Sequence, residues 1–453
     1  MSPDTKSELR IMLRLARPLV AGQVMLFSTN VVDTLLAGHL GPEVLGAVAI
    51  GSSVWMVPLM LLQGLMFTVP AKVSHLIGAG RRAQVGVVFR QAMYLAAGTG
   101  LLITFSILLL ARPLAGLLRL EPGLQEGMVQ FLLALAPGGP ALGLFMACRG
   151  LSDGLSRTKP AMWFGVLSVV LLLPLGYVLM YGAFGYAGQG ARGSGLATSI
   201  VLWIEAGVFL IYVARTSAYR GIGWERGRMG PDAAEIASLL RLGIPMAASV
   251  VLETSLFSAA AFAIARFGAV AVAAHQIALN VAALAFMVPL GMSGAITVRV
   301  GDAAGAGDIA RARLAGWLGI MLAAISQSFS CAVLLLLPMP IAMLYSSDPA
   351  VQAGTVSLLA FAAMFQLSDG IQVAANGALR GLHDTSIPAV ITLVAYWGVG
   401  MPVGLALAFW FGLEARGMWL GLVAGLSVAA VLLTWRFSRR TLAAVQHPHT
   451  LVS

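Results

Sequence analysis

Twelve long apolar stretches occupy most of the chain and constrain its fold more than any other feature. Each contains about 20 residues or more, the length that an α-helix needs to cross a bilayer. Only 10% of the 453 residues are charged, and a soluble domain usually carries about 25%. The sequence therefore predicts an all-α integral membrane protein embedded in a lipid bilayer. The expected spans are residues 13–38, 44–71, 91–111, 127–148, 161–184, 193–214, 238–265, 271–298, 315–337, 352–379, 387–411 and 417–436.

Basic residues are distributed unequally between alternate loops. With these twelve spans, 23 of the 28 Lys and Arg residues fall on the side that holds both termini. Because cytoplasmic loops carry the excess of Lys and Arg, we expect both termini to be cytoplasmic in a bacterial inner membrane. The net charge of +10 then reflects membrane topology, and no nucleic-acid partner is expected.

The sequence contains an internal repeat. LRLARP at 13–18 matches LRLGIP at 240–245, and the same offset of 227 residues aligns seven further identical residues without a gap. Each half carries six spans in the same order, so the two copies have the same orientation in the membrane. We therefore expect two six-helix bundles, an N-lobe over residues 1–225 and a C-lobe over 226–453. Duplicated bundles that alternate access to a site are typical of transporters.

Four acidic residues lie well inside the predicted spans: Asp33, Glu205, Glu253 and Asp369. A carboxylate at a helix centre costs about 2.5–3.5 kcal/mol on insertion scales, so such residues usually bind ions, protons or substrate. For Glu205 we favour a structural role, because no polar stripe accompanies it along its helix.

The other three acids have polar neighbours at helical spacing, and no Lys or Arg lies within these stripes. Arg149 and Arg380, at the ends of their spans, are interpreted as interfacial anchors. The missing partner is therefore a cation: Na⁺, which oxygen ligands would hold, or a proton, since burial favours a neutral carboxyl. The pattern leaves the choice open, and no resident cofactor is expected. The polar candidates for a substrate cleft are Asn30, Gln276, Asn280, Gln372 and Asn376.

Over nearly its whole length the chain resembles the multidrug and toxic compound extrusion (MATE) family, in its NorM-like branch. The resemblance implies a V-shaped molecule of twelve helices. It also implies export of bulky, often cationic, compounds in exchange for sodium or protons. The stretches that carry it are VVDTLLAGHLG ending at Gly41, VAAHQIALN at 272–280, VPLGMSGAITVRVG at 288–301 and DGIQVAANGALRGLHDTSIPAVITLVAYW at 369–397.

The resemblance also implies roles for single residues. Glu253 and Asp369 match the acids of the C-lobe cation site, which would hold Na⁺ in a sodium-coupled protein, and Asp33 matches the N-lobe acid. The segment 171–182 lacks the asparagines that neighbour this N-lobe acid in relatives, so Asp33 has fewer expected ligands. Phe365 stands where relatives can carry tyrosine, which leaves a cation–π contact but no hydroxyl.

Two other functions are compatible with a duplicated membrane protein. A flippase for lipid-linked saccharides, of the wider superfamily, would need Arg and Lys for pyrophosphate, whereas the charges inside these spans are acidic. An integral-membrane transferase would need an acidic metal-pyrophosphate cluster or a nucleophile with a base, and no DxxxD-type cluster occurs in the sequence. We therefore expect a monomeric, non-enzymatic transporter of small-molecule drugs and organic cations.

Overall fold

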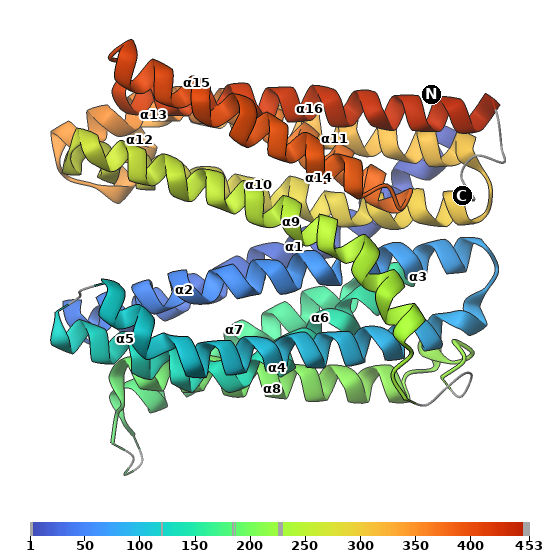
Figure 1. Cartoon of the computed structure of the whole chain (residues 1–453), viewed down its shortest axis with the longest axis horizontal. Helices are drawn as coiled ribbons and strands as arrows, with labels where there is room; N and C mark the ends of the chain where they lie inside the picture. Colours follow the sequence, from blue (N-terminus) through green and yellow to red (C-terminus); the bar gives the residue numbers. More distant parts are fainter. Residues whose placement is uncertain (1–2, 119–120, 184, 186, 225–229, 447–453) are drawn as a thin grey trace. The chain divides into compact units, whose positions relative to one another are not determined.

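The computed structural model describes residues 3–118, 121–183, 185, 187–224 and 230–446. Within these ranges it contains twelve helical segments that are long and apolar enough to cross a membrane, which confirms the predicted number (Figure 1). The expected all-α fold is likewise confirmed. Several crossings are longer than predicted, because their helices extend beyond the apolar stretch, as in Asp4–His39 and Ala269–Gly305.

The described chain divides into two compact units. The N-unit is Ala21–Ala247, and the C-unit is Met1–Val20 together with Ala248–Ser453. This division differs from the predicted boundary at 225/226, because the start of each repeat packs with the other repeat. The physical reason is apolar packing: Met12, Leu15 and Leu19 are buried in the core of the C-unit, and Leu239 is buried in the core of the N-unit.

The N-unit contains six crossings. Two of them are interrupted, one at Phe67 and one by the short helix η2. The elements are α1 (Pro3–His39, from Ala21), α2 (Pro42–Met66), α3 (Thr68–Gly78), η1 (Arg82–Gln84), α4 (Val85–Leu118), α5 (Pro122–Leu135), η2 (Ala136–Gly138), α6 (Gly139–Gly154), α7 (Lys159–Tyr181), α8 (Gly190–Arg215), η3 (Ser217–Tyr219) and the first half of α9.

The C-unit repeats this plan, with a short extra helix, α12, after its third crossing. Its fifth crossing contains two π-helical segments, η5 and η6. The elements are the first half of α1, α9 (Ala233–Ile264, from Ala248), η4 (Ala265–Phe267), α10 (Ala269–Gly305), α11 (Ile309–Leu336), α12 (Pro338–Tyr345), α13 (Pro349–Gly381), α14 (Ser386–Leu393), η5 (Val394–Gly400), α15 (Met401–Leu405), η6 (Ala406–Trp410) and α16 (Glu414–Gln446).

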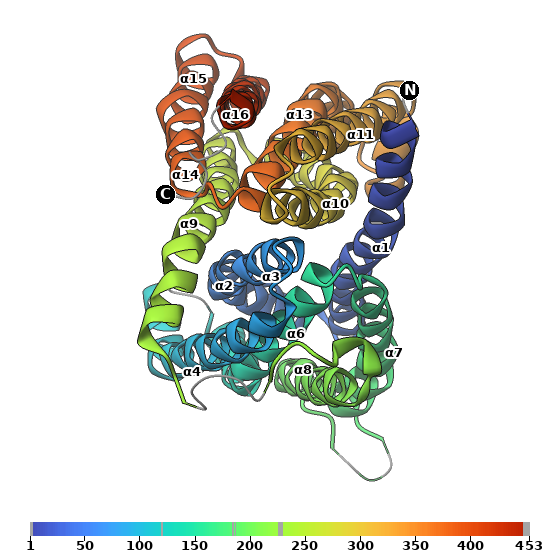
Figure 2. The same ribbon diagram turned by 90° about the vertical axis from the view of Figure 1, so that its right-hand side faces the viewer.

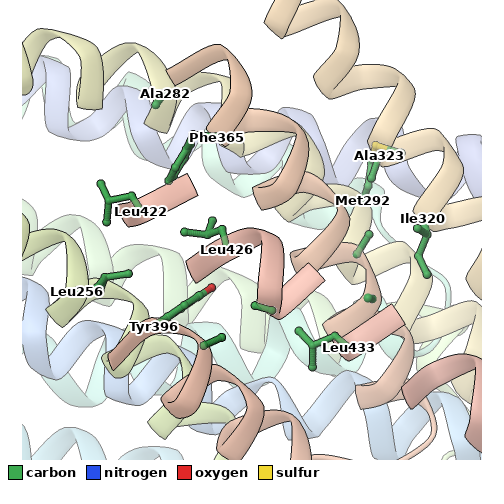
Figure 3. Packing of buried hydrophobic residues seen from close by; sticks show 14 of the residues in the cluster. Leu256, Ala282, Met292, Ile320, Ala323, Phe365, Tyr396, Leu422, Leu426 and Leu433 are labelled. Carbon is green, nitrogen blue, oxygen red and sulfur yellow. The ribbon is translucent and has the colours of Figure 1, made fainter. Parts of the chain in front are cut away.

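Helix α13 is central to the C-unit and packs against α10, α11 and α16 (Figure 2). Small residues allow this close approach, since a Cβ added at Gly377 would lie 2.7 Å from the carbonyl oxygen of Ser293. The Thr297 hydroxyl on α10 donates a hydrogen bond of 2.8 Å to the Gly377 carbonyl. Phe365 and Tyr396 are among the large buried side chains of this core (Figure 3). Tight packing here fixes the polar face of α13.

Candidate functional site

Two carboxylates meet inside the C-unit and share one amide. Gln372 on α13 donates hydrogen bonds of 3.3 Å to Glu253 on α9 and of 3.3 Å to Asp369, one turn earlier on its own helix. Asp369 and Gln372 are buried, and Glu253 is half-buried. The structure therefore brings together three residues that the sequence placed on two separate helices.

Aromatic rings pack one turn away from each carboxylate. Phe257 follows Glu253 by one turn and Phe365 precedes Asp369 by one turn, and their ring centroids are 5.7 Å apart. Phe365 also packs edge-to-face on Trp419 of α16, at 5.8 Å. The face of a phenyl ring attracts a cation within about 6 Å of its centroid, so this cluster is suited to a site for positive charge.

Arg380 and Tyr396 also belong to the surroundings of the carboxylates, although the sequence predicted neither of them as a site residue. The guanidinium of Arg380 is in electrostatic range of Glu253 and donates a hydrogen bond to the Ser293 hydroxyl. Its burial, with 7% of the residue exposed, contradicts the prediction of an interfacial anchor. Arg380 lies three turns beyond Asp369 on α13, so the periodicity of the helix places both residues on the same face. Tyr396 carried no such signal, because it comes from another helix.

The remaining polar candidates are placed differently. Gln276 and Asn280 are exposed on α10, and Asn376 is half-buried on α13. Among the described residues, Gln372 is the only one of the five polar cleft candidates that hydrogen-bonds a carboxylate. Gln366 serves the core instead: it accepts a hydrogen bond from Gln327 and donates one to the Ala282 carbonyl.

Asp33 occupies a second polar site, in the N-unit. The Ser194 hydroxyl lies 3.2 Å from Asp33 Oδ1, and the Thr198 hydroxyl lies 3.4 Å from Oδ2. Both hydroxyls come from α8, where they are one turn apart, so the absence of asparagines in 171–182 does not leave Asp33 unpartnered. The sequence shows that Ser194 and Thr198 are one turn apart. It does not show that their helix lies beside α1. Asn30 is exposed, one turn earlier on α1.

Glu205 is buried among helices of the N-unit. It is 1% exposed and interacts with Ser168 of α7. Arg149 pairs with Asp153 on its own helix at 3.6 Å. These contacts within one bundle are compatible with the structural role expected for Glu205, which stays a prediction.

Within the described residues, no group of three or more His, Cys, Asp and Glu side chains could hold a metal ion. The C-unit site instead offers two carboxylates and one amide. Carboxylate and carbonyl oxygens are hard ligands that suit hard cations. Two neighbouring carboxylates can equally take up a proton, so this set of side chains fits Na⁺ and H⁺ alike.

Comparison with known families identifies the architecture. The family model described as MatE matches residues 18–178 and 245–406. The chain belongs to the MatE family. The two matched segments begin 227 residues apart, the offset of the internal repeat, so the family pattern occurs once in each half.

Similar proteins align with almost the entire chain. It is 42% identical over 436 residues to a probable multidrug resistance protein NorM of Xanthomonas campestris pv. campestris, covering 96% of this chain and 95% of the relative. It is 40% identical over 438 residues to the multidrug resistance protein PmpM of Pseudomonas aeruginosa, covering 96% of this chain and 92% of that protein. This agrees with the resemblance to the NorM-like branch.

Solved MATE structures share the fold. A MATE protein crystallised in the bent conformation has a TM-score of 0.89 at 20% sequence identity, with 100% of both chains covered. A MOP superfamily transporter from Pyrococcus furiosus, described as having a binding pocket of reverse polarity, also has a TM-score of 0.89 at 20% identity. The match covers 98% of this chain and 99% of the chain of that transporter. At these identities the likeness concerns the fold alone.

Proposed function

We propose that this MATE protein is a secondary multidrug efflux transporter that exports organic, often cationic, compounds in exchange for Na⁺ or H⁺. The observation that carries the coupling proposal is the pair Glu253 and Asp369, bridged by Gln372 within the C-unit. The names of the NorM and PmpM relatives support the substrate class. The coupling ion is cargo, and no resident cofactor is required.

The mechanism follows from the charge of the pair. Two carboxylates that share one amide repel each other when both are ionised, and burial adds the cost of desolvation. The guanidinium of Arg380 offsets part of the charge on Glu253, which leaves the pair with a net negative charge when both acids are ionised. A proton or Na⁺ removes the remaining repulsion, so the site binds it when the gradient supplies it from outside. After the ion leaves on the inner side, the negative charge attracts an organic cation. Coupling is then competition, direct or through conformation, for the same carboxylates.

The first experiment uses everted membrane vesicles and a fluorescent organic cation. A sodium gradient and a pH gradient are imposed separately, and movement of the probe is followed for the unchanged protein, Glu253→Gln and Asp369→Asn. We expect one gradient to drive transport and both variants to abolish it. Glu126→Gln is the matched control, because Glu126 is an exposed acid that accepts a hydrogen bond only from Gln130 among the described residues.

Two outcomes of this experiment would contradict the proposal. Full transport by both variants would remove the C-unit pair from the coupling mechanism. Absence of transport under either gradient would instead favour a flippase, which reconstituted vesicles with a labelled lipid-linked saccharide would then test.

We further propose that the protein is a monomer of the bacterial inner membrane with both termini in the cytoplasm. The distribution of Lys and Arg supports this orientation. A C-terminal fusion to green fluorescent protein should fluoresce, whereas a fusion to alkaline phosphatase should be inactive. The reverse pattern would contradict the orientation.

A further inference from the structure

Tyr396 combines complete burial with an unsatisfied hydroxyl. It is 0% exposed, and its hydroxyl has no hydrogen-bond partner among the described residues. Leaving a buried hydroxyl unpaired destabilises the fold. An apolar ring of the same shape would avoid this cost. The position therefore needs an explanation beyond packing.

The surroundings of Tyr396 point to the carboxylate pair. Its ring belongs to the same buried cluster as Leu256, one turn from Glu253, and Phe365, one turn from Asp369. Its hydroxyl points into the bundle (Figure 3). The hydroxyl therefore lies near both Glu253 and Asp369. Tyr396 belongs to the π-helical segment η5, and such segments are often found at functional sites.

We propose that the Tyr396 hydroxyl is a further member of the ion site formed by Glu253 and Asp369. It supplies an oxygen ligand to a bound Na⁺, or donates a hydrogen bond to a carboxylate that has lost its proton. The inference rests on the proposed function, because it assigns a role in the same site.

Tyr396→Phe tests this role, since it removes one oxygen and keeps the ring. A hydrogen bond to a charged group is worth about 1.5–3 kcal/mol, which corresponds to about tenfold or more in affinity. In a sodium-driven protein, the variant should need about tenfold more Na⁺ for half-maximal efflux. In a proton-driven protein, the half-maximal point should move to higher pH, because the ionised carboxylate has lost a donor. Maximal efflux should persist in both cases.

The matched control is Tyr219→Phe, which removes a hydroxyl that lies 2.9 Å from the Ser152 hydroxyl in the N-unit. It should leave the ion dependence unchanged. An unchanged ion dependence in Tyr396→Phe would overturn the assignment of Tyr396. If Glu253→Gln and Asp369→Asn still abolished efflux in the same assay, the proposed function itself would stand.

A second inference rests on two ion pairs that the internal repeat relates to each other. Arg299 on α10 binds Glu8 on α1 with two hydrogen bonds, of 2.7 and 2.8 Å. Lys72 on α3 binds Glu235 on α9 at 2.7 Å. The offset of 227 residues relates Glu8 to Glu235 and Lys72 to Arg299, so the same acid–base pair occurs once in each unit.

Each ion pair joins the two repeats. Glu8 belongs to the first repeat but pairs within the C-unit, and Glu235 belongs to the second repeat but pairs within the N-unit. The chain passes between the units only within α1, after Val20, and within α9, after Ala247. Each acid therefore anchors the beginning of a helix that continues into the other unit.

We infer that these two ion pairs act as latches that hold the beginnings of α1 and α9 on the opposite repeat and open during each transport cycle. Ionic contacts suit this role because charged groups released from a pair are readily solvated by water. The Glu8–Arg299 pair is the tighter latch, since its side chains are only 5% and 6% exposed. Those of Glu235 and Lys72 are 30% and 13% exposed, so water screens that pair more.

Reversible crosslinking tests whether the latches must open. In a protein that lacks Cys148 and Cys331, one variant carries cysteines at both positions 8 and 299. A second variant carries cysteines at both positions 72 and 235. The side chains of each pair are long, so a bifunctional methanethiosulfonate reagent with a short spacer is preferable to a direct disulfide, which needs Cα atoms within about 7 Å. We expect crosslinking to abolish efflux and a reductant to restore it.

The control crosslinks positions 384 and 436, because Asp384 and Arg436 form an ion pair of 2.8 Å within one repeat. This link should leave efflux intact. Full efflux by the crosslinked 8/299 and 72/235 proteins would overturn the latch proposal. Efflux is also measured after the crosslink has been reduced. Efflux that is absent even then would count against the proposed function, and not against the latches.

Discussion

At the scale of single residues, Gln372 has a role that charge alone does not reveal. It is a neutral side chain, yet it touches both acids of the C-unit site. We expect Gln372→Ala to weaken ion-dependent efflux by about tenfold, since a hydrogen bond to a charged group contributes about 1.5–3 kcal/mol. Gln352→Ala is the control, because this glutamine lies near the start of α13 and its amide donates a hydrogen bond to the Ser346 carbonyl. Equal effects of the two variants on half-maximal ion concentration would argue against a special role for Gln372.

The acids of the N-unit offer a second comparison between residues. Asp33 accepts contacts from two hydroxyls of α8, whereas Glu205 is buried and interacts with Ser168. We expect Asp33→Asn to reduce efflux, because an amide has no negative charge with which to bind a proton or cation. We expect Glu205→Gln to retain efflux, because an amide can still hydrogen-bond the Ser168 hydroxyl. Initial efflux rates, normalised to the amount of protein in the vesicles, would measure this. Loss of efflux with unchanged thermal stability in Glu205→Gln would contradict its structural role.

At the scale of helices, close approach of α10 and α13 holds the site residues in register. Gly377→Ala would press a methyl group against Ser293, whose carbonyl oxygen and hydroxyl lie 2.7 and 2.8 Å from the added Cβ. Overpacking of this kind costs about 1–3 kcal/mol. We expect a lower melting temperature in detergent, measured by tryptophan fluorescence.

The control for this helix contact is Gly98→Ala on α4, where an added Cβ meets nothing within 4 Å. Alanine favours a helix over glycine by about 1 kcal/mol, so the control should melt at the same temperature or higher. A destabilised Gly98→Ala together with an unaffected Gly377→Ala would contradict the packing argument.

At the scale of the whole molecule, each unit contains a segment from the other repeat. Met12, Leu15 and Leu19 of the first repeat are buried in the core of the C-unit. Expressed alone, residues 1–224 or 230–453 should therefore be unstable, because each fragment lacks part of its own core. Coexpressed fragments should copurify through a tag on one of them. Fragments that each purified as stable, monodisperse proteins would contradict the exchange of segments.

Sequence alone determined the membrane class, the twelve crossings, the repeat and the buried acids. Each of these follows from local chemistry: apolar length, the distribution of charge and the cost of a carboxylate in lipid. Only the tertiary structure decided which helices exchange between repeats and which hydroxyls meet Asp33. It also decided that Gln372 bridges two acids and that Arg380 and Tyr396 lie near them. Such contacts depend on how helices far apart in the chain rotate and pack. The periodicity of residues within one span does not specify which other helix packs against it.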